Sequence, residues 1–79
     1  MIDIKEKDTE RGFERVEFKD KYNNDCSIQV SSNIESQLWI GVNENRMLIE
    51  QEDCIDIAMY LLRFYYEGKL YKKSDEEKR

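Results

Sequence analysis

A chain of 79 residues is long enough for one small domain with a thin hydrophobic core. It contains no histidine, so it lacks the commonest general base and the commonest metal ligand, and no phosphate-binding glycine loop or nucleophile motif is present. We therefore expect no enzymatic activity, no cofactor and no metal. The net charge of −5 disfavours nucleic acid as a ligand unless basic residues gather on one face, and it suits a partner with a basic surface.

The cysteine count and the chain ends suggest a cytoplasmic protein. Cys26 and Cys54 are too few for the disulfide framework of a small secreted domain, so we expect two reduced thiols, with a disulfide between them as the alternative. Residues 1–12 do not resemble a signal peptide, and no apolar run is long enough to span a membrane. No membrane contact is expected.

The first half of the chain predicts strands. Residues 1–11 are charged and are expected to form a loose N-terminal segment. Residues 13–19 alternate, with Val16 and Phe18 on one face, and the polar turn that follows contains Asn23 and Asn24, which tolerate left-handed backbone.

The strongest strand signal covers residues 25–31, where Cys26, Ile28 and Val30 face inward. After a connection at 31–36, residues 37–42 form a strand that places Trp39 outward. A turn at 43–45 then leads to a short strand at 46–49, with Met47 and Ile49 inward.

The periodicity becomes helical after Glu50. Apolar residues then recur at three- and four-residue spacing (Cys54, Ile57, Ala58, Leu61, Phe64 and Tyr65), and Gly68 fits a helix stop. Residues 72–79 read as a charged flexible tail. The predicted fold is α+β: a four-stranded antiparallel meander with one C-terminal helix packed on one sheet face, in a single ββββα domain over residues 12–71.

The uncovered sheet face is the predicted contact surface. It would carry Trp39 among polar residues, and a large aromatic on such a face marks a candidate partner site. The alternative is that the N-terminal segment covers Trp39 with Ile2 and Ile4. The expected partner-binding residues are Trp39, Phe13, Arg15, Ser27, Gln29, Ser31, Glu50, Glu52, Asp53 and Asp56. The four acidic members also suit a helix start or a stripe that mimics phosphates.

Several segments together resemble a family of small, mostly uncharacterised proteins of bacteriophages and prophages. They are "DCSIQVSS", "LWIG" and "RMLIEQEDCIDIAMYLLRFYYEGKL", within residues 13–70. Other members have a longer segment before Arg46, so a site in that loop would be missing here. The resemblance implies a phage origin and no particular activity.

A phage origin favours a protein that binds and inhibits a host protein in the bacterial cytoplasm. The most concrete target is a CRISPR–Cas effector, which would make the chain an anti-CRISPR; another nucleic-acid-handling defence protein is also in this class. The acidic surface would steer the chain toward a basic groove.

Two other functions stay open. The order of strands and helix resembles the single-strand-binding transcriptional coactivator fold, which implies a homodimer whose sheet face binds single strands. Trp39 and Phe13 would then stack on bases, with Arg15, Lys19 and Lys21 along the phosphates. The third alternative is a homodimeric structural module without a ligand, paired through the aromatic C-terminal helix.

Overall fold

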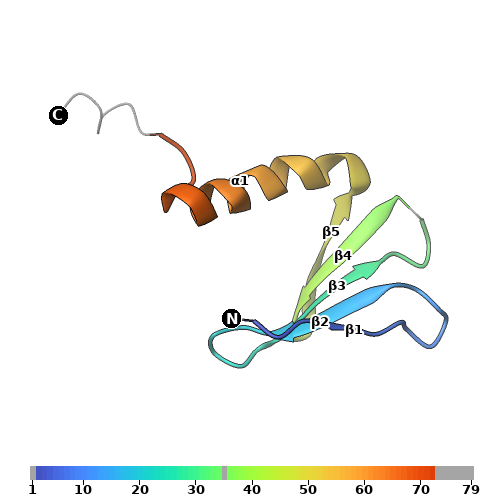
Figure 1. Ribbon diagram of the computed structural model, residues 1–79. Helices are drawn as coiled ribbons and strands as arrows, with labels where there is room; N and C mark the ends of the chain where they lie inside the picture. Colours follow the sequence, from blue (N-terminus) through green and yellow to red (C-terminus); the bar gives the residue numbers. More distant parts are fainter. Residues whose placement is uncertain (1, 35, 73–79) are drawn as a thin grey trace.

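The computed structural model describes residues 2–34 and 36–72. Five strands form one antiparallel sheet in chain order, and one helix follows them (Figure 1). The elements are β1 (Lys5–Glu6), β2 (Arg15–Lys19), β3 (Asp25–Val30), β4 (Gln37–Val42), β5 (Asn45–Glu50), a short 3-10 turn η1 (Gln51–Asp53) and α1 (Cys54–Glu67). The predicted α+β class, antiparallel sheet and C-terminal helix are confirmed, whereas the predicted number of four strands is wrong.

The additional strand lies in the segment that we expected to be loose. β1 pairs with β2, with Lys5 opposite Glu17 and Glu6 opposite Val16. The backbone N–H of Lys7 also donates to the Arg15 carbonyl at 2.9 Å. Because this pairing uses backbone groups and exposed charged residues, it leaves no alternation in the sequence. The predicted flexible tail covers mostly residues 73–79, which lie outside the described residues.

Asparagine and aspartate side chains fix the two tight turns. In the β2–β3 turn the Asp20 carboxylate accepts hydrogen bonds from the Asn24 side chain and from the backbone N–H groups of Asn24 and Tyr22, each at 2.9 Å. These bonds lower the pKa of Asp20 below its usual value, and the bond from the Asn24 side chain has the largest effect. Asn23 and Asn43 adopt positive φ angles of 68° and 55° in the two turns, as asparagine readily does.

The predicted alternation of side chains is confirmed by the register of the sheet. Val16, Ile28, Ile40 and Met47 are directly paired across β2 to β5, so one face carries a continuous apolar row. We call this the apolar face. Arg15, Gln29, Trp39 and Leu48 form the neighbouring row, which lies on the opposite face because successive side chains alternate.

The helix has the predicted end. Gly68 adopts a left-handed conformation with φ of 73°, and its N–H donates to the Phe64 carbonyl at 2.8 Å. This is the usual glycine stop, in which the missing Cβ removes the cost of a positive φ.

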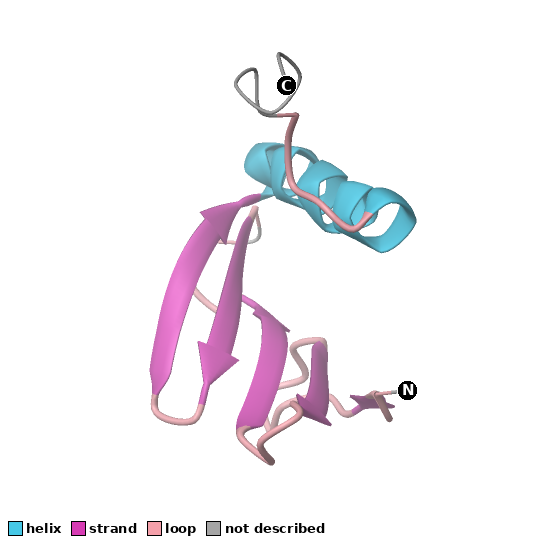
Figure 2. Ribbon diagram, turned by 90° about the vertical axis from the view of Figure 1, so that its left-hand side faces the viewer, coloured by secondary structure: helices cyan, strands magenta, loops and turns pink. Residues whose placement is uncertain are grey.

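The predicted packing of the helix on the sheet is wrong. The main contacts of α1 are with η1, the segment that precedes it in the chain, and Figures 1 and 2 show the helix projecting away from the strands. Because η1 follows β5 without a loop, the chain has no segment in which to turn the helix back over the sheet. Among the hydrophobic residues described, Cys26 and Ile49 alone are buried, and Met47 on the apolar face is 52% exposed. Both cysteines are free thiols.

Candidate partner-binding site

Side chains from four strands meet on the face opposite the apolar face, which we call the polar face. The row Arg15–Gln29–Trp39–Leu48 lies beside the row Glu17–Ser27–Gly41–Arg46, because each set is paired directly in the sheet. An open hollow of about 210 Å³ lies between them. Its lining residues are Arg15, Ser27, Gln29, Trp39, Gly41, Asn43, Glu44, Asn45 and Arg46.

Trp39 is the centre of this face, and an arginine stacks on it. The indole is half-buried, and the guanidinium carbon of Arg46 lies 4.6 Å from its ring centroid. The two residues are diagonal neighbours on β4 and β5, within reach of long side chains. Such a stack at an exposed site contributes about 0.5–1 kcal/mol and fixes the orientation of both groups.

Arg15 is held in place by two polar partners. Its Nε donates to Glu17 Oε2 at 2.7 Å, and a terminal nitrogen donates to Gln29 Oε1 at 2.8 Å. The hydrogen bond from Arg15 also lowers the pKa of Glu17 below its usual value. Because Glu17 offsets its charge, Arg15 presents a fixed donor surface rather than a free cation.

Gly41 keeps the hollow open. It is buried near the end of β4, and a Cβ built on it would lie 2.9 Å from Ser27 Oγ. Any larger residue would therefore push against Ser27 and fill the space beside Trp39. The hollow depends on this close approach of β3 and β4.

The N-terminal segment does not cover Trp39. Ile2 and Ile4 are 52% and 58% exposed, and β1 extends the sheet at β2, whereas Trp39 lies on β4. The alternative of a second small core around Trp39 is therefore wrong.

Four of the ten predicted contact residues line the hollow together: Trp39, Arg15, Ser27 and Gln29. Phe13 lies just before β2 and is half-buried, with its N–H bonded to Thr9 Oγ1 at 3.0 Å, and it does not line the hollow. Ser31 is 2% exposed, and its Oγ accepts hydrogen bonds from the N–H groups of Asn33 and Ile34. Its assignment to an exposed contact surface is therefore wrong, since β3 ends at Val30 and Ser31 fixes the following turn.

The acidic residues are exposed at the end of β5 that is opposite the turn residues lining the hollow. Glu50 ends β5 and accepts a hydrogen bond from Gln37 Nε2 at 2.8 Å. Glu52 and Asp53 belong to η1, and Asp56 lies in the first turn of α1. They form an acidic strip that leads from the polar face to the start of the helix.

Sequence reasoning missed Arg46 and Leu48 as parts of this face, whereas the alternation that places Trp39 outward also places Gly41 there. Once the β4–β5 turn fixes Trp39 opposite Leu48, Arg46 follows two residues earlier on the same face. The register of the hairpin was therefore the signal that would have found it.

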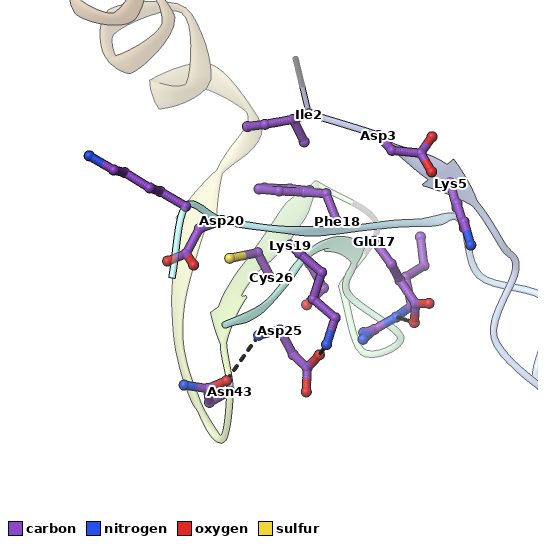
Figure 3. Close-up of a pocket in the computed structure, with 13 residues that line it drawn as sticks. Ile2, Asp3, Lys5, Glu17, Phe18, Lys19, Asp20, Asp25, Cys26 and Asn43 are labelled. Carbon is purple, nitrogen blue, oxygen red and sulfur yellow. Dashed lines mark hydrogen bonds and ion pairs between the residues drawn. The ribbon is translucent and has the colours of Figure 1, made fainter. Parts of the chain in front are cut away.

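A larger open hollow of about 930 Å³ lies where β1 to β3 meet. Figure 3 shows Ile2 and Phe18 on one side of β2, with Glu17 and Lys19 on the other. The residues that line this hollow come from both faces of the sheet, so they do not form one continuous surface for a ligand. Lys19, which could bind an anion there, is already paired with Asp25.

Within residues 2–34 and 36–72, no three potential ligands among His, Cys, Asp and Glu cluster at a metal-binding distance. In the same part of the chain, no helix has the length and apolar character needed to cross a bilayer.

Comparison with known protein families finds no match, and neither the curated proteins nor the solved structures contain a significant match. The fold and the geometry of the site therefore carry the functional argument.

Proposed function

We propose that the chain is a non-enzymatic binding protein that attaches to a partner protein through the polar face around Trp39. The observation that carries this proposal is the stack of Arg46 on Trp39 beside a preformed hollow. Tryptophan and arginine are the residues most enriched among those that dominate protein–protein binding energies. Fixed side chains also lose little conformational entropy on binding.

The charges around Trp39 favour a protein over a nucleic acid. Arg15 is paired with Glu17, Lys19 with Asp25, and Arg46 lies on the indole ring. A single-strand-binding groove needs cations available to the phosphates. Here the acidic strip of Glu50, Glu52, Asp53 and Asp56 adjoins the face instead, and the net charge is −5. These features support a partner with a basic surface.

The partner class is a nucleic-acid-handling protein of a bacterial host, and the action is inhibition in the host cytoplasm. A basic nucleic-acid groove complements the acidic strip, and Trp39 supplies an apolar anchor beside it. A CRISPR–Cas effector is the most concrete target, which would make the chain an anti-CRISPR of a phage or prophage.

The test combines binding and cleavage with purified CRISPR effectors and other host nucleases. We expect inhibition of target cleavage by the wild-type chain, and about 30-fold weaker binding for Trp39→Ala, the loss expected for a binding hot spot of about 2 kcal/mol. Tyr22→Ala is the matched control, because Tyr22 is an aromatic residue 79% exposed in the β2–β3 turn.

A second variant separates steering from anchoring. Glu52→Gln combined with Asp53→Asn should slow association at low salt, whereas Trp39→Ala should mainly speed dissociation. Absence of binding with undiminished cleavage across these targets would refute the inhibitor function. Salt-sensitive binding of a fluorescent single-stranded oligonucleotide would favour the coactivator-like alternative instead.

A further inference from the structure

A single copy of this chain exposes many of its large hydrophobic side chains. Its accessible surface is 7337 Å², whereas a folded monomer of its mass would expose about 5,100 Å². The radius of gyration is 15.7 Å, against about 11.6 Å for a compact domain of this length. A single copy is therefore more extended and more exposed than a compact monomer of the same size.

Two uncovered apolar surfaces contribute to this excess. On α1, Ile57, Leu61 and Phe64 follow one stripe of the helix and are 40%, 66% and 59% exposed. On the sheet, the apolar face formed by Val16, Ile28, Ile40 and Met47 has no covering element, since α1 projects away from it (Figure 2).

We infer that a second copy of the chain covers both surfaces, with α1 of each copy against the apolar face of the other. A two-fold pair buries the same patches on both copies, and here each copy provides both the helix and the sheet that the other lacks. If half of the excess surface is buried on each copy, the interface totals about 2,200 Å². That area lies in the range of obligate homodimers, about 2,000–5,000 Å².

This inference does not rest on the proposed function, because the polar face is not used in the pairing. Sedimentation equilibrium of the full chain should give about twice its 9.6 kDa. Leu61→Glu should abolish the dimer, whereas Tyr60→Glu should leave it intact. Tyr60 shares the polar side of α1 with Asp56 and Arg63 at helical spacing, and it is 52% exposed.

Unfolding of Leu61→Glu alone would also support the pairing, since a monomeric fold tolerates glutamate at a position that is 66% exposed. An independent readout is isotope-filtered NMR on mixed labelled and unlabelled wild-type chains. It should detect contacts between the methyl groups of Leu61 on one copy and Ile28 or Ile40 on the other.

A wild-type chain that is folded and monomeric at 100 µM would overturn the inference. If that monomer floats with phosphatidylcholine vesicles, a lipid surface covers the helix instead. A dimer whose only inter-copy contacts lie around Trp39 would overturn it as well.

Discussion

The close approach of β3 and β4 at Gly41 makes a quantitative prediction for Gly41→Ala. The new Cβ would lie 2.9 Å from Ser27 Oγ, 3.6 Å from the Asn45 carbonyl oxygen and 3.8 Å from Arg46 Cβ. The first contact is too short, so either Ser27 rotates or the strands separate. Overpacking of this kind costs about 1–3 kcal/mol, while replacing a strand glycine by alanine regains about 0.5–1 kcal/mol. We expect a net loss of about 1 kcal/mol.

A double-mutant cycle with Ser27→Ala isolates that contact. Without the Ser27 hydroxyl, Gly41→Ala should be neutral or stabilising, which gives a coupling of about 1 kcal/mol or more. The assay is urea unfolding at one fixed protein concentration, because the stability of a self-associating chain depends on concentration. If Gly41→Ala is stabilising in the wild-type background, or if the two substitutions are additive, the close approach of β3 and β4 is not as described.

Three further substitutions test the turns and the helix end. Ser31→Ala should lower the unfolding free energy by about 1 kcal/mol, because the buried hydroxyl accepts hydrogen bonds from two backbone N–H groups. Ser31→Thr keeps the hydroxyl and should lower the unfolding free energy by less. Equal losses for the two variants in urea unfolding would contradict this role. Gly68→Ala should lower the unfolding free energy by about 1 kcal/mol, because a side chain with a Cβ is strained at a φ of 73°. Gly68→Asn should lower it by less, since asparagine tolerates this conformation. Thermal unfolding measures both, and an unchanged Tm for Gly68→Ala would exclude a strained helix cap. Asp20→Asn should be less stable than the wild type at pH 7, and the difference in stability should begin to narrow as the pH falls below about 4. The lowered pKa of Asp20 gives stability that is present above its unfolded value and is lost as the pH falls through its folded value. Urea midpoints that differ by the same amount at pH 7 and pH 2.5 would contradict this sign.

Alternation and helical periodicity predicted most of the secondary structure because each depends on local spacing. Val16, Ile28 and Ile40 share one face as their positions require, and Gly68 ends the helix as its freedom at positive φ allows. The stripe on α1 indicated a packing surface, which the structure leaves exposed. It did not indicate what covers it, since an amphipathic helix has the same pattern whether it packs on its own sheet or on another chain.

The missed parts of the site depend on pairing between distant residues. Trp39 was placed on the open face by alternation alone, but the stack with Arg46 needed the β4–β5 register. Ser31 was assigned to the same face by extending the alternation one residue beyond the end of β3. β1 was missed because its two charged residues pair through the backbone.

We infer two separate contact faces: the apolar face and α1 for a second copy, and the polar face around Trp39 for a partner protein. Trp39 is the one tryptophan in the chain, so its fluorescence reports on the polar face alone. At a concentration that keeps the chain dimeric, its emission should shift to shorter wavelength when the inhibited target is added, while the mass of the complex still includes two copies of the chain. An emission that ignores a bound target, or a target that binds only when the dimer dissociates, would contradict the inference.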